Sequence, residues 1–360
     1  MNIYVFGTRG FPDIQGGVEK HCEELYTSMP DKYKITVFRR KPFVKSNKTY
    51  KMIRFIDLPT VKTKGLEALI HSFLCTLYCI AKRPEIIHIH NIGPGLFIPI
   101  LKIVGLKVIL TYHSPNYEHS KWSYWAKKGL KLCEFIATKG ADKIIFVNNN
   151  QLKKFNTAIQ AKSIYIPNGI KETIKVNNSS FIKKLGLLPY QYILAVGRIT
   201  QEKGFDYLIK AYNLLQDKSI KLVIAGGCDH SSDYTKRFIK EARSSHVILT
   251  GYMNEEQLGH LYTYAKLFIL PSFNEGYPIV LVEAINYQKP ILASNIEANK
   301  SIGLTNDRYF EVGSVSDLKN KIEEEVRKDY AKASYNISIP TWKEVANLVS
   351  EIYVSTIKKQ

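Results

Sequence analysis

The sequence contains few cysteines. There are five among 360 residues, an odd number, and no two of them form a Cys-x-x-Cys pair. A framework of paired disulfides and a cysteine-based zinc or redox motif are therefore not expected. We expect reduced thiols and a reducing compartment.

Long apolar runs are also missing. The most apolar stretches cover residues 66–80 and 92–110, but the first carries Glu67 and His71, and the second is interrupted by lysine, glycine and proline. Neither offers the roughly 20 apolar residues that a transmembrane helix needs. The first six residues lead directly into a glycine-rich turn, so we expect no signal peptide. A cytoplasmic protein is the expectation.

Acidic residues are scarce in the first half of the chain. The whole chain has a net charge of +19, and residues 1–167 hold 26 basic and 11 acidic side chains, against 25 and 21 in the remainder. The first half should attract an anionic lipid surface, a pyrophosphate-linked acceptor or nucleic acid, unless the charge only reflects a basic proteome. Because no nucleic-acid-binding module accompanies the charge, no nucleic-acid partner is expected.

Motifs for metals and dinucleotides are absent as well. No Asp-x-Asp pair occurs, and His88 and His90 share one strand face without a third ligand nearby in the sequence. We expect these histidines to be packed or hydrogen-bonded, and we expect no metal and no cofactor. The spacing Gly-x-Gly-x-x-Gly is also missing, so the first loop is not a dinucleotide fingerprint.

What is present is an alternation of short β-rich runs and helical stretches. The runs cover residues 2–6, 35–38, 52–56, 86–90, 107–111 and 143–147, and a second series begins at 192–196. This order predicts parallel, doubly wound α/β sheets. The length is sufficient for two domains.

Three loops at strand ends carry candidate functional residues. Gly16 and Gly17 follow the first strand and precede a helix, where backbone N–H groups can meet an anion, although a simple turn is the alternative. Arg198 and Lys203 follow the strand 192–196 and suit a diphosphate, although two exposed cations often mean little. His113 also follows a strand, and a lone histidine there is commonly structural.

A fourth candidate segment covers residues 268–285 and contains two glutamates. Glu275 lies in a loop after an apolar strand, and Glu283 lies in the apolar helix that Pro278 opens. Their spacing suits a polyhydroxylated ligand, because each carboxylate can accept two hydrogen bonds from a diol. The alternative is a helix-capping Glu275 and a structurally paired Glu283.

The pattern Phe273-Asn274-Glu275-Gly276-Tyr277-Pro278 through Glu283-Ala284 resembles the glutamate pair of the retaining glycosyltransferases of family 4. The resemblance implies that Glu275, with Gly276 and Tyr277, holds the donor sugar, and that Glu283 holds the ribose of the nucleotide. It extends to the diphosphate motif of Arg198 and Lys203.

In the first half, the resemblance places His113 against the donor sugar, and Gly16 and Gly17 near the donor pyrophosphate and the acceptor. The segment Gly-Thr-Arg-Gly-x-Pro at residues 7–12 is similar to a subgroup used in bacterial polysaccharide assembly, some of it rhamnosyl transfer. Catalytic roles fall on His113, Glu275, Arg198 and Lys203.

The resemblance also implies the domain organisation known as GT-B, with two Rossmann-like domains facing a cleft. Residues 1–170 would bind the acceptor, and residues 171–339 would bind the nucleotide sugar. Residues 340–360 would form a last helix that returns to the first domain. The spacing of apolar and basic side chains over residues 121–140 predicts an amphipathic helix. We expect this helix to dock on the sheet, and the alternative is that it contacts a membrane.

The implied activity is retaining transfer of a sugar from a nucleotide-diphosphate sugar to an acceptor hydroxyl, for instance on a lipid-linked glycan in surface polysaccharide assembly. Peripheral contact with the inner face of the cytoplasmic membrane would suit that role. Two alternatives remain: a nucleotide-sugar epimerase on the same scaffold, and a non-catalytic nucleotide-sugar-binding protein.

Overall fold

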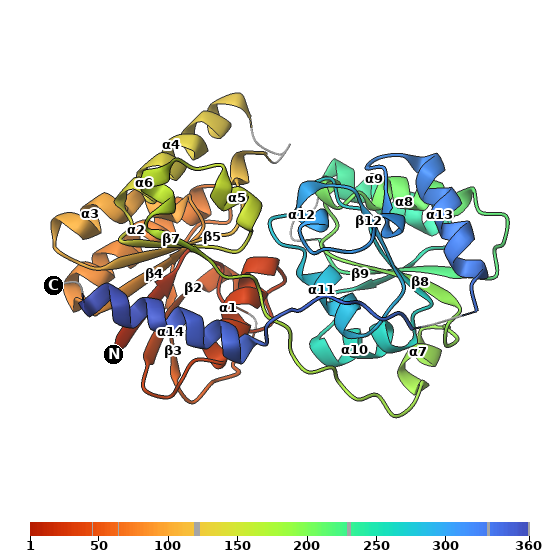
Figure 1. Cartoon of the computed structure of the whole chain (residues 1–360), viewed down its shortest axis with the longest axis horizontal. Coiled ribbons are helices and arrows are strands. Elements are labelled where there is room, and N and C mark those ends of the chain that lie inside the picture. Colours follow the sequence, from red (N-terminus) through yellow and green to blue (C-terminus); the bar gives the residue numbers. More distant parts are fainter. Residues whose placement is uncertain (45, 64, 119–122, 229–231, 330–331, 359–360) are drawn as a thin grey trace. The chain divides into compact units, whose positions relative to one another are not determined.

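The computed structural model describes the whole chain except residues 45, 64, 119–122, 229–231, 330–331 and 359–360. The chain forms two compact units (Figure 1). Unit 1 consists of Met1–Gly169 together with Pro340–Gln360, and unit 2 consists of Ile170–Ile339. Each unit is described by itself below.

Unit 1 is built on a seven-stranded parallel sheet in the order β3-β2-β1-β4-β5-β6-β7. Its strands are β1 (Asn2–Phe6), β2 (Lys34–Arg40), β3 (Ile53–Leu58), β4 (Ile86–His90), β5 (Val108–Tyr112), β6 (Lys143–Phe146) and β7 (Ser163–Tyr165). Every residue of β4 and β5 is buried, as expected for a parallel sheet that is covered on both faces.

Alternate residues of these strands belong to two separate hydrophobic cores. Ile3 and Val5 of β1 pack with α1 (Gly17–Thr27) and α14 (Trp342–Lys358). Ile87 and Ile89 of β4 pack on the opposite face with α2 (Leu66–Lys82), α3 (Ile98–Ile103) and α4 (Tyr124–Gly140). The short helices α5 (Asn149–Lys153) and α6 (Thr157–Gln160) lie between β6 and β7 in the chain.

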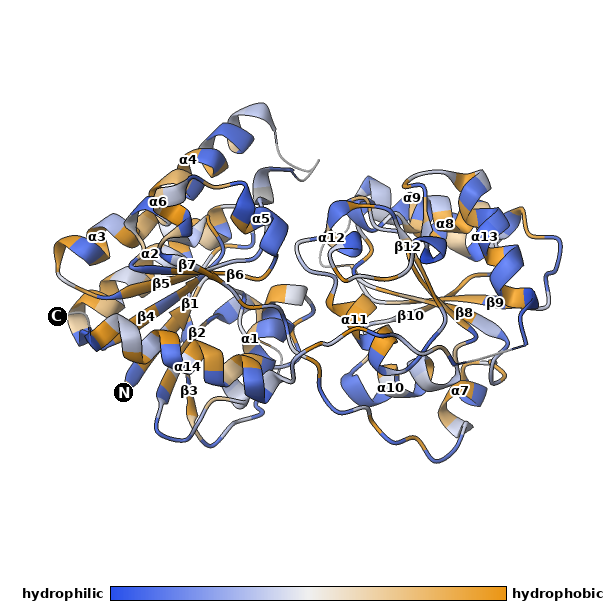
Figure 2. Cartoon of the chain, viewed as in Figure 1, coloured by the Kyte–Doolittle hydropathy of each residue, from blue (hydrophilic) through white to orange (hydrophobic). Residues whose placement is uncertain are grey.

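Unit 2 repeats this design with a six-stranded parallel sheet in the order β10-β9-β8-β11-β12-β13. Its strands are β8 (Tyr192–Val196), β9 (Lys221–Ala225), β10 (Ile248–Gly251), β11 (Leu267–Leu270), β12 (Ile291–Ser294) and β13 (Tyr309–Phe310). The apolar strands stand out against the mixed outer helices in Figure 2. The predicted pair of doubly wound, Rossmann-like domains is confirmed.

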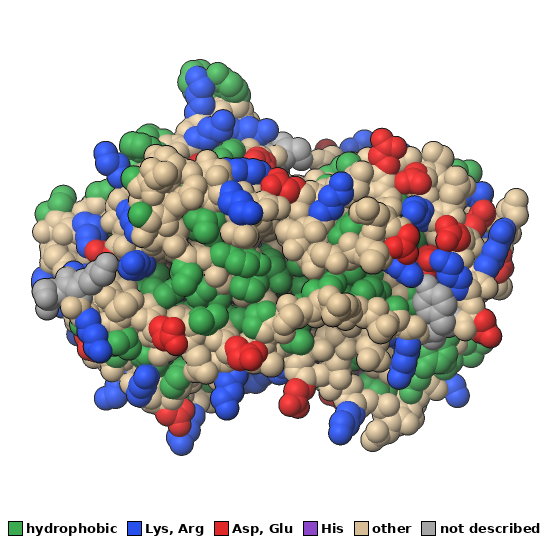
Figure 3. Space-filling view, viewed as in Figure 1, with side chains coloured by type: hydrophobic (Ala, Val, Ile, Leu, Met, Phe, Trp, Pro, Cys, Tyr) green, Lys and Arg blue, Asp and Glu red, His purple; other side chains and the backbone are tan. Residues whose placement is uncertain are grey.

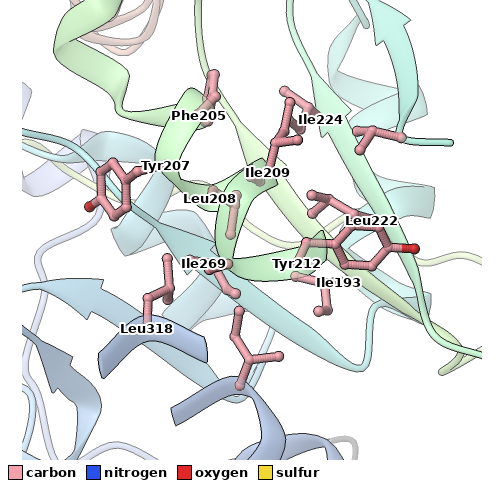
Figure 4. Close-up of a cluster of buried hydrophobic side chains, with 14 of the residues drawn as sticks. Ile193, Phe205, Tyr207, Leu208, Ile209, Tyr212, Leu222, Ile224, Ile269 and Leu318 are labelled. Atoms are coloured by element: carbon pink, nitrogen blue, oxygen red, sulfur yellow. The ribbon is translucent and has the colours of Figure 1, made fainter. Parts of the chain in front are cut away.

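Helices cover both faces of the second sheet. One core, drawn in Figure 4, joins β8, β9 and β11 to α8 (Phe205–Asn213), α9 (Asp233–Ser244) and α13 (Val315–Arg327). The other core joins the sheet to α7 (Ser180–Lys184), α10 (Glu255–Tyr264) and α11 (Ile279–Asn286). The four-residue helix α12 (Glu297–Lys300) follows β12.

The chain passes between the units twice, and both passages meet unit 1 at the same place. A Cβ atom on Gly169 would lie 2.7 Å from the backbone nitrogen of Trp342, so only glycine fits there. Trp342 then begins α14, which buries Val345, Val349 and Tyr353 in the core of unit 1. The C-terminal helix thus belongs to the first unit.

The helix predicted over residues 121–140 is present as α4, and Ala137 near its C-terminal end packs in the core, but its N-terminal half does not dock as we expected. Residues 121 and 122 lie outside the described residues, and within α4 only Ala137 and Thr138 are buried. Trp125, expected on the docked face, is 76% exposed. The projecting end of α4 carries hydrophobic and basic side chains (Figure 3, top). Among the described residues, no helix combines the length and the apolar character needed to cross a bilayer.

Candidate functional site

Unit 2 has its topological switch point between β8 and β11. These two strands are neighbours in the sheet, whereas the chain continues from β8 to β9 on one side and from β11 to β12 on the other. Ligands of open α/β sheets bind beyond the carboxyl ends of such strands. The loop after β8 carries Arg198 and Lys203, and the loop after β11 carries Glu275.

The two loops are packed directly against each other. Gly204 has φ +66°, and a Cβ atom there would lie 2.1 Å from the carbonyl oxygen of Pro271. The Tyr207 hydroxyl donates to that same oxygen at 2.5 Å. The backbone N–H of Phe273 donates to the carbonyl of Glu202 at 2.8 Å. This close backbone approach fixes the position of one loop relative to the other.

Lys203 and Glu275 form an ion pair across these loops. Lys203 Nζ lies 2.6 Å from Glu275 Oε1, and the Ser272 hydroxyl donates to the same oxygen at 2.6 Å. The side chains of Lys203 and Glu275 are only 19% and 10% exposed. The alternative reading of Glu275 as a helix cap is wrong, because α11 begins after Pro278 without a side-chain cap. Glu275 is instead held in place by a cation and a hydroxyl.

Arg198 leaves the same loop as Lys203. It lies two residues beyond the end of β8 and is half-buried, and Lys203 ends a one-turn 3-10 helix over Gln201–Lys203. The loop therefore supplies a guanidinium, which can bind two oxygens at once, and an ammonium at one sheet edge. Gly276 and Tyr277, also half-buried, connect Glu275 to α11.

Glu283 lies in the second turn of α11 and is half-buried. Its Oε2 accepts a hydrogen bond of 2.9 Å from the hydroxyl of Tyr262 on α10. Burial, and next the charge of Glu283, raise the pKa of Tyr262 well above its ordinary value, so the hydroxyl keeps its proton and donates. Tyr262 stacks on Tyr287 with ring centroids 5.2 Å apart. The Tyr262 hydroxyl therefore helps to fix the orientation of the Glu283 carboxylate.

Unit 1 has the equivalent switch point between β1 and β4. The loop after β1 runs close to β4, because a Cβ atom on Gly7, which has φ +111°, would lie 2.0 Å from the carbonyl oxygen of His90. Gly16 and Gly17 follow this loop, and Gly17 is the first residue of α1. A Cβ atom on Gly16 would lie 1.9 Å from the Glu19 carboxylate, so a larger residue there would displace that side chain.

His113 directly follows β5 and joins a cluster of buried histidines. Its Nε2 lies 3.0 Å from His90 Nδ1, and its ring centroid lies 4.7 Å from that of His21 on α1. His88 stacks on His90 with centroids 4.5 Å apart. His88 and His90 are packed and hydrogen-bonded as we expected, but the structure also brings His21 and His113 close to His90. Spacing along the chain gave no signal for His21, which comes from a different element.

Two tyrosines extend the cluster into the core. The Tyr26 hydroxyl lies 2.6 Å from His90 Nε2 and 3.0 Å from His88 Nδ1, and the Tyr353 hydroxyl of α14 lies 2.7 Å from the same His88 nitrogen. Burial lowers the pKa of His21 to about 4 and of His88 to about 3. Burial, with the neighbouring imidazoles, also lowers the pKa values of His90 and His113. All four rings are neutral at pH 7.

The predicted site residues thus fall into two groups. In unit 2 the structure brings Lys203 and Glu275 into contact and places Arg198, Gly276, Tyr277 and Glu283 in the same two loops or the helix that follows. In unit 1 it places Gly16, Gly17 and His113 after the carboxyl ends of β1 and β5. Each group lies at the edge where its sheet is expected to bind a ligand.

Two protein-family models match the chain, one in each half. The model described as "Glycosyltransferase Family 4" matches residues 15–173, and the model described as "Glycosyl transferases group 1" matches residues 178–336. The matched segments together contain every candidate site residue named above.

Individual proteins agree with these models. An uncharacterized glycosyltransferase of Methanocaldococcus jannaschii is 25% identical over 351 residues, which is 94% of either chain. The O-antigen chain mannosyltransferase B of Escherichia coli is 28% identical over 144 residues, 39% of this chain and 36% of that protein.

Among solved structures, the Anabaena protein HepE in complex with UDP-glucose aligns with a TM-score of 0.72 at 15% identity, over 99% of this chain and 97% of that one. This likeness shows the fold. Together with the two family models, it establishes that the chain belongs to glycosyltransferase family 4 and has the GT-B fold.

Proposed function

We propose that the protein transfers a sugar from a nucleoside-diphosphate sugar to an acceptor hydroxyl with retained anomeric configuration. The observation that carries this proposal is the Lys203–Glu275 ion pair at the β8–β11 switch point, with Arg198 in the same loop. A cation beside a carboxylate at that edge offers one group for the phosphates and one for sugar hydroxyls. The UDP-glucose complex of the structural neighbour supports this class of donor.

Arg198 and Lys203 bind the diphosphate and stabilise the charge that develops as it leaves. The guanidinium binds two phosphate oxygens, and the ammonium supplies a point charge. Lys203 is held in advance by Glu275, so little reorganisation is needed during the reaction. With these cations present, the proposed mechanism needs no metal ion and no cofactor.

Glu275 accepts hydrogen bonds from the donor sugar, next to Gly276 and Tyr277, and Glu283 accepts them from the ribose. Ser272 occupies one oxygen of Glu275, and Tyr262 donates to one oxygen of Glu283. Each carboxylate can accept further hydrogen bonds, which a diol can donate.

Unit 1 supplies the groups for the acceptor. His113 contacts the donor sugar, and Gly16 and Gly17 lie near the pyrophosphate and the acceptor in this proposal. Unit 1 holds 29 basic and 13 acidic side chains, which suits a pyrophosphate-linked glycan. The O-antigen relative supports a role in surface polysaccharide assembly. Because no carboxylate of unit 1 stands out as a nucleophile, we propose front-side attack by the acceptor.

We further propose a cytoplasmic protein that touches the inner membrane face through unit 1. Large apolar side chains are exposed on α2 and α4: Leu66, Leu69, Phe73, Leu77, Tyr124, Trp125, Leu132 and Phe135. Lysines lie over three of these rings, with Lys128 Nζ 4.7 Å from the Tyr124 centroid and Lys139 Nζ 5.5 Å from that of Phe135. Apolar side chains flanked by lysines suit an anionic lipid surface.

Vesicle sedimentation tests the membrane contact. We expect binding to vesicles with anionic lipid, weakened by salt, and little binding to phosphatidylcholine alone. The Trp125→Ser variant should bind less, whereas Leu214→Ser, which changes an apolar residue of unit 2 that is also largely exposed, should not. Equal binding of both variants would contradict a surface on α4.

Thermal stabilisation by UDP, GDP, dTDP, ADP and NAD tests the donor site. A ligand at about one hundred times its dissociation constant stabilises the protein by roughly 2.7 kcal/mol, which raises the melting temperature by several degrees. We expect a shift with one nucleoside diphosphate, and its loss in Arg198→Ala. A shift with NAD alone would contradict the proposal.

Product analysis separates the remaining alternatives. Incubation of the matching nucleotide sugar with a glycan acceptor should yield a glycoside with the anomeric configuration of the donor. An altered nucleotide sugar formed without acceptor would identify an epimerase. Binding without turnover of any acceptor would identify a binding protein.

A further inference from the structure

One imidazole nitrogen in the core of unit 1 has no hydrogen-bond partner. Nε2 of His21 is buried and unpaired among the residues that the structure describes. An unpaired polar atom in a protein interior carries a desolvation penalty. A ligand bound to this nitrogen would remove that penalty.

The other nitrogen of this ring determines which atom carries the proton. His21 Nδ1 lies 2.6 Å from Oδ1 of Asn168, and an amide oxygen can only accept a hydrogen bond. Nδ1 of the neutral ring is therefore the donor, and Nε2 carries a free lone pair. Metal-binding histidines show the same arrangement, in which one nitrogen donates to an oxygen and the other binds the metal.

The lone pair of His21 lies near two further imidazoles. His21, His90 and His113 each offer a nitrogen such that the three atoms lie within 4.8 Å of one another, and all three side chains are buried. His90 Nδ1 and His113 Nε2 are already 3.0 Å apart. In a tetrahedral zinc site with bonds of about 2.0–2.1 Å, the ligand nitrogens lie roughly 3.3 Å apart. Small side-chain rotations would bring the three nitrogens to this spacing.

We propose that His21, His90 and His113 form a binding site for a divalent transition-metal cation of the zinc class. Three imidazoles and no carboxylate favour Zn²⁺, Co²⁺ or Ni²⁺ over Mg²⁺ or Ca²⁺. Three protein ligands leave the fourth tetrahedral position for water or another small ligand. The site lies within unit 1 and contains neither of the proposed diphosphate contacts, Arg198 and Lys203, but it includes His113, which the proposed function places against the donor sugar.

Groups around the ligands are placed to hold them in the metal-binding form. Asn168 accepts a hydrogen bond from His21, and the Tyr26 oxygen lies 2.6 Å from His90 Nε2, where it can accept a hydrogen bond from that nitrogen. The Tyr26 hydroxyl can in turn donate to His88 Nδ1 at 3.0 Å. In the metal-free site one hydrogen lies between His90 Nδ1 and His113 Nε2. When the metal binds, the ring that carries this hydrogen takes the other tautomer, with the hydrogen on its second nitrogen. Binding of the metal therefore releases no proton.

Titration of the full-length protein, stripped with a chelator, tests the site. We expect one equivalent of Co²⁺ to give the visible absorption of a tetrahedral nitrogen complex, and Zn²⁺ to displace it and raise the melting temperature. His21→Gln should weaken Zn²⁺ binding by more than about 100-fold, and Asn168→Ala by about 10–100-fold, because it only removes the partner that orients His21.

Two controls keep this test independent of folding and of sugar transfer. His88→Gln removes an imidazole from the same strand face without removing a ligand, and should keep the Co²⁺ spectrum. Circular dichroism establishes which variants are folded. A stoichiometric spectrum that persists in folded His21→Gln, or no tetrahedral spectrum in the wild type, would overturn the proposal. Neither readout depends on glycosyltransferase activity.

Discussion

The two units share one architecture but have different side chains at corresponding places. Each is a parallel sheet with its switch point near the middle, between β1 and β4 in unit 1 and between β8 and β11 in unit 2. In unit 2 the loops at that edge carry an arginine, a lysine and a glutamate. In unit 1 the same edge is occupied by neutral, buried imidazoles from β4, α1 and the end of β5.

This difference shows what the fold determines and what it leaves to individual residues. The strand order fixes where a ligand is bound, while the side chains decide which chemistry is available. Unit 2 is charged at this edge and should respond to salt and to loss of a cation. Unit 1 has buried histidines near this edge and should respond to acid. Four experiments test this contrast, ordered from the largest expected effect to the smallest.

Acid should unfold unit 1 before unit 2. Burial lowers the pKa of His21 and of His71, which also lies near Arg40, to about 4, and that of His88 to about 3. At a pH below about 6.5, the ordinary pKa of histidine, the unfolded chain binds protons that the folded unit does not. The stability of unit 1 therefore decreases as the pH is lowered. At pH 5 each of these histidines should destabilise metal-free unit 1 by about 2 kcal/mol.

Tryptophan fluorescence can measure this effect, because all three tryptophans belong to unit 1 and none to unit 2. Fluorescence reports the unfolding of unit 1, and the remaining change in circular dichroism reports the unfolding of unit 2. As the pH is lowered from 6.5 to 5, we expect the fluorescence transition to move to a lower urea concentration than the circular-dichroism transition. None of the described histidines of unit 2 is buried. A single transition at every pH would contradict the independence of the two units.

Truncation of Tyr353 should destabilise unit 1 next most strongly. Tyr353 is fully buried against α1 and β4 and donates to or accepts from His88 at 2.7 Å. Tyr353→Ala should cost about 3–5 kcal/mol, as for other buried aromatic residues. Leu348→Ala, on the same helix but 39% exposed, is the control and should cost far less. Equal urea midpoints for both variants would argue against α14 as part of the core.

Removal of the Lys203 charge should affect transfer rather than folding. Lys203→Met keeps the length of the side chain but loses the ammonium that pairs with Glu275. We expect the transfer rate to fall by about 10²–10³, the usual effect of losing one electrostatic donor. Lys210→Met, at an exposed position on α8, is the control. A rate within threefold of the wild type would remove Lys203 from the diphosphate role.

Loss of the Tyr262 hydroxyl should have the smallest effect. Tyr262→Phe removes the donor to Glu283 and should destabilise unit 2 by about 1–2 kcal/mol. Tyr212→Phe, which loses a hydrogen bond of 3.1 Å to the carbonyl of Ile220, is the matched control. Calorimetry should show similar losses of stability, but only Tyr262→Phe should weaken binding of the nucleoside diphosphate. Equal affinities would argue against a ribose contact by Glu283.

The candidate residues of unit 2 could be predicted from the sequence because each lies in a segment that follows an apolar strand. Arg198, Lys203 and Glu275 follow apolar strands, and the carboxyl ends of parallel strands meet at one edge. The alternation of strands and helices was likewise sufficient for the fold class. The direct contact of Lys203 with Glu275 depends on strand order, which local patterns do not contain.

The histidine cluster could not be predicted in this way. His21, His90 and His113 come from a helix, a strand and a loop, and Asn168 comes from the passage into unit 2. Their proximity is a consequence of tertiary packing alone. The exposure of α4 was missed for a related reason: an amphipathic pattern identifies an apolar face but not whether another element covers it.

The return of α14 to unit 1 has a consequence for synthesis on the ribosome. The N-terminal unit cannot complete its core until Trp342, Val349 and Tyr353 have been made, after the whole of unit 2. At about 5–20 residues per second, the intervening 170 residues of Ile170–Ile339 take roughly 10–30 s to translate. The unit made first is therefore finished last, and during this interval its incomplete core is the part of the nascent chain most in need of a chaperone.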